Sequence, residues 1–227
     1  YDATKAGLTG ANWASKTNAL ADENGLLEDV NTSFTSACPR QYAAQLIYNT
    51  IFAHTVTLRD GEYTNMNLLG TDKLETVGEK YLKLVTDEDL ILDSMSYDDN
   101  KDQYSFLGYT KIKGDYSALM GQKVKVLHEK NKTDKVFGVY ADPDSKVVAT
   151  AICDDLDTVS SSNEKIKVDG TEYKTDGALS SVQVFDFNQS AVAGKLASYI
   201  DNADVAPYSI KLIDNDDNGK IDRAVVT

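Results

Sequence analysis

The segment of this chain with the clearest chemical potential is an acidic run near its end, Asp214-Asn215-Asp216-Asp217-Asn218-Gly219-Lys220-Ile221-Asp222. Oxygen-bearing side chains occupy its first, third and fifth positions, Asp214, Asp216 and Asn218. From alternate positions of a tight loop they can converge on one hard cation, and Gly219 at the sixth position permits the sharp turn. The run therefore matches the first half of an EF-hand loop.

The second half of the run departs from an EF-hand. Its seventh position, Lys220, can offer a backbone carbonyl, but the twelfth is Val225, where an EF-hand has Glu. Asp222 at the ninth position would close the shell instead, so we expect a short extracellular type of Ca²⁺ loop with weak affinity. The alternative is a plain hairpin with a type I′ turn at Asn218-Gly219. The expected ligands are Asp214, Asp216, Asn218, Lys220 and Asp222.

Nothing comparable points to catalysis. The two histidines, His54 and His128, lack metal-ligand spacing to each other or to a cysteine. The chain contains no G-x-S-x-G elbow to position a nucleophile and no glycine-rich phosphate loop before a helix. Acidic pairs such as Asp154-Asp155 are expected by chance in so acidic a chain, so we predict no enzyme and no catalytic residues.

Two short helices are expected near the start of the chain. The first spans Asn12 to Asn24, and Gly25 follows where a C-terminal cap belongs. The second begins with Pro39 as its first helical residue and ends near His54. Its expected buried stripe consists of Ala43, Leu46, Ile47 and Ile51. Two such helices bury little by themselves and need neighbours.

After Gly61 the pattern becomes that of strands and turns, which predicts an α+β chain with a helical part, 1–61, and a β-rich part, 62–227. Lys123 to Leu127 and Val182 to Phe187 are expected strands. Three hairpins are expected, across the turns 142–145, 169–170 and 215–220. One late helix is predicted over Ser190 to Asn202, from the spacing of Val192, Leu196, Tyr199 and Ile200, with Ser190 as its cap.

Composition narrows the class of protein. The 227 residues include 36 acidic and 23 basic ones, a net charge of −13 at pH 7, which argues against binding to nucleic acid or to anionic membranes. No apolar run is long enough to span a bilayer. Cys38 and Cys153 are expected to be small buried residues rather than a disulfide. Because the chain opens on Tyr1 and closes on Val225-Val226-Thr227, inside an expected strand, we expect a fragment of a longer protein.

The helical part also carries a composite motif, Trp13-Ala14 opening the first helix and Glu23-Asn24-Gly25-Leu26-Leu27 closing it, followed by Phe34, Arg40 and Ala43 to Asn49. Taken together over Ala11 to Leu58, it resembles an S-layer homology repeat, by which many Gram-positive surface proteins attach to cell-wall polysaccharide. From about Met66 to Thr227 the chain is similar to regions that follow such repeats in large clostridial surface proteins.

This resemblance implies a helical fold and a polysaccharide groove to which Trp13 and Arg40 would contribute. Trp would stack on a sugar ring and Arg would pair with a carboxylated sugar. The family's Thr-Arg-Ala-Glu signature here reads Pro39 to Tyr42, with only the arginine retained. We therefore keep open that Trp13 is a core residue and that Arg40 only ties the helix start to a loop.

The resulting hypothesis is a non-catalytic, secreted structural or anchoring protein of the cell surface or cell wall, binding polysaccharide and Ca²⁺ and contacting neighbouring domains of the same protein. The alternative is an accessory module of a secreted carbohydrate-active enzyme whose catalytic domain lies outside this chain. Flanking sequence separates the two, since further repeats favour the first and a catalytic domain the second.

Overall fold

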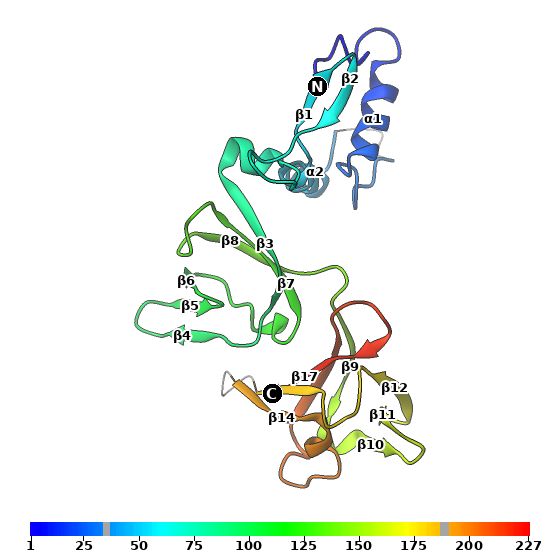
Figure 1. The fold of residues 1–227 in the computed structure, drawn as a ribbon, viewed down its shortest axis with the longest axis vertical. Coiled ribbons are helices and arrows are strands. Elements are labelled where there is room, and N and C mark those ends of the chain that lie inside the picture. Colours follow the sequence, from blue (N-terminus) through cyan, green and yellow to red (C-terminus); the bar gives the residue numbers. More distant parts are fainter. Residues whose placement is uncertain (34–36, 187–190) are drawn as a thin grey trace. The chain divides into compact units, whose positions relative to one another are not determined.

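The first helix, α1 (Trp13–Glu23), ends where the sequence predicts, because Gly25 adopts a left-handed conformation with φ of 70°. The computed structural model describes residues 1–33, 37–186 and 191–227 (Figure 1). Leu26 N–H donates to the Ala21 carbonyl at 2.8 Å and Gly25 N–H to the Asp22 carbonyl at 3.0 Å. These two bonds form a Schellman motif, which satisfies carbonyls that the helix end would leave unpaired.

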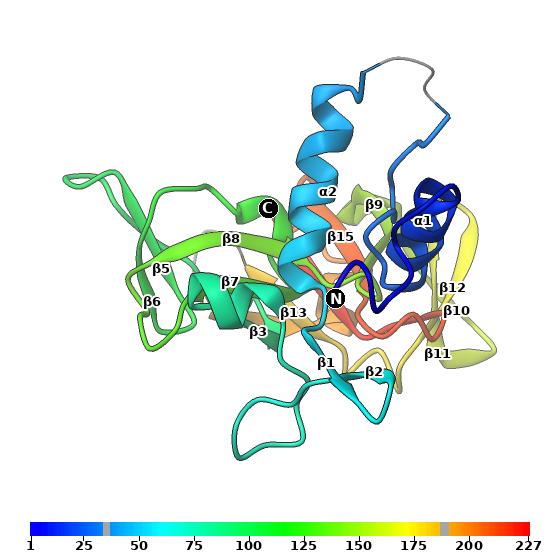
Figure 2. The same cartoon turned by 90° about the horizontal axis from the view of Figure 1, so that it is seen from above.

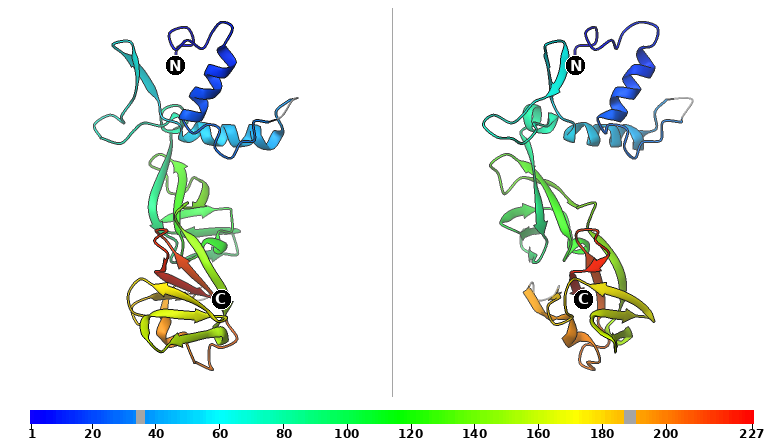
Figure 3. Two further views of the ribbon diagram at one scale, coloured as in Figure 1. Left: turned by 90° about the vertical axis from the view of Figure 1, so that its right-hand side faces the viewer. Right: turned by 45° about the vertical axis from the view of Figure 1, so that its right-hand side comes forward.

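The second helix, α2 (Arg40–Phe52), begins one residue later than expected, since Pro39 is its extended N-cap residue. Its apolar stripe is not buried as predicted: Ile47 is 67% exposed, and neither helix contains a fully buried residue. The two helices run in clearly different directions in both views of Figure 3. Because neither helix has a buried residue, the described helices contribute to no sealed apolar core.

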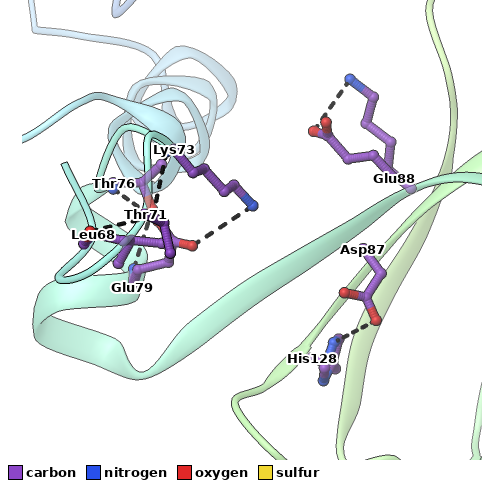
Figure 4. A network of polar contacts seen from close by, with 9 residues as sticks. Leu68, Thr71, Lys73, Thr76, Glu79, Asp87, Glu88 and His128 are labelled. Carbon is purple, nitrogen blue, oxygen red and sulfur yellow. Dashed lines mark hydrogen bonds and ion pairs between the residues drawn. The ribbon is translucent and has the colours of Figure 1, made fainter.

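A hairpin and a π-helical turn follow the helices. Strands β1 (Val56–Arg59) and β2 (Glu62–Asn65) pair in antiparallel register around Asp60-Gly61, beyond the C-terminal end of α2 (Figure 2). The π-helical turn η1 (Gly78–Leu82) starts with a capping box, in which Thr76 Oγ1 accepts from Glu79 N–H and Glu79 Oε2 accepts from Thr76 N–H (Figure 4).

The described chain divides into two compact units, Tyr1–Val85 and Thr86–Thr227. The hairpin β1–β2 and η1 therefore belong with the helices, whereas the sequence placed the boundary after residue 61. Within the described part of the first unit, only Thr55 and Gly78 are buried. Both hydrophobic core clusters lie in the second unit.

One core cluster of the second unit is formed by two three-stranded sheets, β3-β7-β8 and β4-β5-β6, together with Phe185, Ile213 and Val225 of a five-stranded sheet. Along β7 the residues Val124 and Val126 are fully buried, which confirms the expected strand and its inward face. The strands are β3 (Leu84–Ile91), β4 (Ser96–Asp98), β5 (Gln103–Phe106), β6 (Tyr109–Ile112), β7 (Lys123–Glu129) and β8 (Val136–Ala141). The short helical turn η2 (Ser117–Leu119) precedes β7.

The other cluster packs between a five-stranded sheet, β14-β13-β17-β15-β9, and a four-stranded sheet, β10-β11-β12-β16. The β11–β12 hairpin is confirmed, with both Asp169 and Gly170 at positive φ as a type I′ turn requires. The strands are β9 (Lys146–Ile152), β10 (Leu156–Val159), β11 (Ser162–Val168), β12 (Thr171–Thr175), β13 (Gln183–Asp186), β14 (Ala191–Lys195), β15 (Ser209–Asp214), β16 (Lys220–Ile221) and β17 (Arg223–Val226).

Two further expectations are wrong. The strands on either side of the turn 142–145 exist, but they do not pair: β8 joins β7, and β9 joins β15 in another sheet.

The late helix is replaced by strand β14 and the short turn η4 (Leu196–Tyr199), while its expected cap, Ser190, lies outside the described residues. Leu196 and Tyr199 are nevertheless buried in the core. A 3₁₀ turn has three residues per turn, so it also places residues three positions apart on the same face.

The cysteines, both among the described residues, form no disulfide. Cys153 is buried at the start of the turn η3 (Cys153–Asp155), as expected, and burial raises the pKa of its thiol. Cys38 is exposed, contrary to the expectation, because the start of α2 packs against no core.

Candidate functional site

The acidic run connects the end of β15 to β16 and β17. Asp214 is the last residue of β15, and β15 pairs antiparallel with β17, as the predicted hairpin requires. Asp222 closes the loop at the opposite side, where its N–H donates to the Ile213 carbonyl at 3.0 Å. The loop is therefore held at both ends by strands of the five-stranded sheet.

Three of the predicted ligands come together. Asp214, Asp216 and Asp222 each offer a carboxylate oxygen, and these oxygens lie within 4.8 Å of one another. Asp214 is only 2% exposed, Asp222 is half-buried and Asp216 faces solvent. Three carboxylates so close together repel each other unless a proton or a cation intervenes.

Asp214 organises the turn through its carboxylate. Its Oδ1 accepts from the N–H groups of Asp216 and Asn218, both at 3.3 Å, and its Oδ2 accepts from Gly219 N–H at 2.8 Å. The turn needs two left-handed residues, Asp217 with φ of 54° and Gly219 with φ of 78°. The type I′ turn expected at Asn218-Gly219 is absent, because the left-handed pair includes Asp217 rather than Asn218.

The other two predicted ligands are not in the carboxylate cluster. Asn218 Oδ1 accepts from Lys220 N–H at 2.8 Å, and its Nδ2 donates to Asp216 Oδ2 at 3.0 Å. The Lys220 side chain points to Asp176, 3.7 Å away. Asn218 therefore positions the Asp216 carboxylate, and Lys220 has only its backbone carbonyl to offer to a cation.

The sequence gives no hint of the part played by Asn215, which is 6% exposed. Its Oδ1 accepts from Lys123 N–H and from Ser145 Oγ, both at 2.7 Å. Its Nδ2 donates to the Gly121 carbonyl and to Asp222 Oδ1, both at 3.1 Å. One amide thereby connects the acidic loop to the start of β7 and to the turn before β9.

Burial raises the pKa of the Asp222 carboxyl, and the negative charge of Asp216 acts in the same direction. Hydrogen bonds from Asn215 and the charge of Arg223 oppose this shift. A carboxyl with a raised pKa is poised to exchange its proton for a cation, because both neutralise the same buried charge. The geometry fits a hard cation with oxygen ligands.

The residues suggested for polysaccharide binding lie at the first turns of different helices. Trp13 opens α1 and is 58% exposed, and Arg40 opens α2 and is exposed. The expected loop residue Phe34 lies outside the described residues. A cavity of about 350 Å³ exists in this unit, but neither Trp13 nor Arg40 lines it. Its lining includes Tyr1, Leu20, Asn24, His54, Lys80 and Tyr81.

His128 takes part in a polar cluster that the sequence did not reveal (Figure 4). Its Nδ1 lies 3.0 Å from the Glu129 carbonyl and 3.1 Å from the Lys132 carbonyl, so Nδ1 carries a proton. Its Nε2 lies 3.1 Å from Asp87 Oδ2, which also accepts from the buried Tyr109 hydroxyl. These bonds tie the turn after β7 to β3, and both ring nitrogens are engaged in holding structure.

Comparison with family models, with curated proteins and with solved structures finds no match to this chain. The resemblance of residues 11–58 to an S-layer homology repeat therefore stays a prediction. Within the described residues, no helix has the length and apolar character needed to cross a membrane.

Proposed function

We propose that this chain is a non-catalytic structural part of a secreted cell-surface protein and that its β-rich unit binds Ca²⁺ at the loop Asp214 to Asp222. The observation that supports this most directly is the convergence of Asp214, Asp216 and Asp222 within 4.8 Å, in a loop anchored to the core. Ca²⁺ would be held by their carboxylates, with the Lys220 carbonyl and water completing the shell.

The chemistry of the donors selects the cation. All three side chains offer hard oxygen, and neither histidine nor cysteine belongs to the cluster, which disfavours zinc. Mg²⁺ demands near-ideal octahedral geometry, whereas a loop with one exposed and two more buried carboxylates suits the adaptable shell of Ca²⁺. Such a site, with few protein ligands, falls in the affinity range of extracellular modules, about 10⁻⁴ to 10⁻³ M.

The role of the cation would be mechanical. It offsets two of the three carboxylate charges and fixes Asp222, which in turn holds Asn215 across to the start of β7 and the turn before β9. Binding to the folded state alone would stabilise the unit by about 1 to 3 kcal/mol at Ca²⁺ concentrations of about 10 to 100 times the dissociation constant.

The test is calorimetric titration of the chelator-treated chain with CaCl₂, repeated for Asp216→Asn. Asp216 is exposed, so this variant removes a ligand without disturbing the core, and we expect affinity to fall by about tenfold or more. Asp217→Asn is the matched control, because Asp217 is equally acidic but lies outside the cluster and pairs with Lys146. The absence of binding up to about 10 mM CaCl₂ would contradict the proposal.

We further propose that the helical unit attaches the protein to cell-wall polysaccharide. The exposure of Trp13 and Arg40 supports this, because both side chains can reach a ligand. The test is co-sedimentation with Gram-positive sacculi, with and without their secondary polysaccharide. Arg40→Ala should reduce pelleting, and Arg59→Ala, another exposed arginine of this unit, should not. Equal pelleting of both variants would assign Arg40 a packing role only.

A further inference from the structure

The chain contains two Asn-Gly pairs, Asn24-Gly25 and Asn218-Gly219. In such a pair the backbone nitrogen of glycine can attack the side-chain carbonyl carbon of the asparagine before it and close a five-membered ring, because glycine has no side chain to shield that nitrogen. The two pairs are the same dipeptide, so their surroundings in the folded chain decide which of them reacts.

The surroundings of Asn218-Gly219 favour the attack at each reacting group. Gly219 N–H donates to Asp214 Oδ2 at 2.8 Å, and a carboxylate acceptor makes the amide nitrogen a better nucleophile. Asn218 Oδ1 accepts from Lys220 N–H at 2.8 Å, which polarises the carbonyl that is attacked. Asn218 is also exposed, so that water and hydroxide reach it.

The surroundings of Asn24-Gly25 oppose the attack. Asn24 is half-buried, and its Nδ2 donates to the Leu20 carbonyl at 2.7 Å, which holds the amide against the end of α1. Gly25 N–H donates to the Asp22 carbonyl at 3.0 Å, and a neutral carbonyl activates the nitrogen less than a carboxylate does. Ring closure at Asn24 therefore requires the end of the helix to open first.

We propose that Asn218 is a site of spontaneous deamidation and that the fold protects Asn24. The Gly219 nitrogen gives its proton to hydroxide and forms a bond to Cγ of Asn218. The Cγ–Nδ2 bond then breaks, and the side-chain nitrogen leaves as ammonia with a proton from water. Water opens the resulting cyclic imide at either carbonyl, which yields aspartate or isoaspartate without oxidation or reduction.

Both products change the acidic loop. A carboxylate replaces the amide whose Nδ2 donates to Asp216 Oδ2 at 3.0 Å, so a hydrogen bond gives way to repulsion between like charges. Isoaspartate also inserts a methylene between the N–H groups of residues 218 and 219, which both donate to the Asp214 carboxylate. Deamidation therefore alters the cation site, a consequence that rests on the proposed function.

The test is incubation of the full chain in chelator at mildly alkaline pH, followed by peptide mapping with mass spectrometry, which detects the exchange of an amide for an acid at each asparagine. We expect Asn218 to convert about tenfold faster than Asn24, which reacts only when the helix end opens. Chelator keeps Ca²⁺ out of the measurement, so the result is independent of whether the loop binds it. Equal rates at the two asparagines, or no conversion at Asn218, overturn the proposal.

The same incubation in concentrated urea removes the fold and keeps both dipeptides. There the two asparagines should convert within about threefold of each other, because the unfolded chain retains little of the surroundings that distinguish them. A ratio of the two rates that is as large in urea as in the native chain would overturn the part assigned to the structure.

Gly219→Ala is the matched variant. The space around its Cβ position is open, so alanine adds backbone strain without a clash, and thermal melting establishes that the variant is folded. Its methyl group shields the attacking nitrogen, and we expect conversion of Asn218 to slow by about tenfold while the slower conversion of Asn24 stays unchanged. An unchanged rate at Asn218 in this variant overturns attack by the Gly219 nitrogen.

Discussion

The side-chain amide of Asn215 donates to Asp222 Oδ1 at 3.1 Å and at the same time accepts from the backbone N–H of Lys123 at 2.7 Å. Residues 92 positions apart in the chain are thus joined by one buried side chain. This amide connects the acidic loop to the strand β7, whose apolar face forms part of a core cluster.

Asn215→Ala should be among the most destabilising single changes in the β-rich unit. It removes the acceptor of Ser145 Oγ and the donor to the Gly121 carbonyl in a buried site, and it leaves Lys123 N–H with only its longer bond to Ser145 Oγ, at a cost of about 2 to 4 kcal/mol. Asn218→Ala, in the same loop but exposed, should cost about 1 kcal/mol or less. Urea unfolding followed by far-ultraviolet circular dichroism measures both. Similar costs for the two variants would contradict the role assigned to Asn215.

The acidic loop should make stability depend on pH in a direction unusual for a carboxyl. Because burial raises the folded pKa of Asp222 above its ordinary value of 3.8, the folded state holds this proton more tightly than the unfolded state. In chelator, the contribution of Asp222 to stability is therefore greatest below that value and declines as pH rises through the raised folded pKa.

The measurement is the difference in melting temperature between the wild type and Asp222→Asn across this pH range. In chelator the difference should shift against the wild type as pH rises, and saturating CaCl₂ should reverse that trend, because the cation replaces the proton. A difference independent of pH in chelator would show that the Asp222 carboxyl does not titrate as burial predicts.

Asp87 should be more important for stability than its exposure suggests. Asp87→Ala removes the carboxylate oxygen that accepts from Tyr109 Oη and lies 3.1 Å from His128 Nε2, and we expect a loss of about 1 to 2 kcal/mol. Its neighbour Glu88 has nearly the same side-chain exposure and forms only an ion pair with Lys125 at 3.6 Å, so Glu88→Ala should cost less than about 0.5 kcal/mol. Chemical denaturation of the two variants measures the free energy of unfolding that each one loses.

Gly121 should tolerate no side chain. Its φ is +79°, and an added Cβ would lie 2.4 Å from Val225 Cγ2 and 2.8 Å from Ile213 Cδ1. Gly121→Ala therefore combines backbone strain with overpacking, for a cost of about 2 to 4 kcal/mol. Gly170→Ala has nearly the same φ, +78°, but open space around the site, and should cost about 1 kcal/mol. Thermal unfolding of both variants separates packing from backbone strain.

Several features of this protein follow from residues close together in the chain. The end of α1 needs only Gly25 and the carbonyls of Ala21 and Asp22. The β11–β12 hairpin needs only Asp169-Gly170 between two short apolar runs. The convergence of Asp214, Asp216 and Asp222 is local in the same way, because all three lie within nine residues of one loop. Short-range geometry is sufficient in each case, and for that reason these predictions agree with the structure.

The remaining features depend on partners far along the chain. A turn such as 142–145 can join paired strands or strands of different sheets, and only the competing partners β7 and β15 decide. Leu196 and Tyr199 have helical spacing, yet pairing of β13 with β14 leaves room for a single turn there. The environment of Asn215 likewise comes from β7 and the turn before β9. Burial and strand pairing are properties of the assembled core, and the free energy they contribute outweighs the local preferences that a sequence pattern expresses.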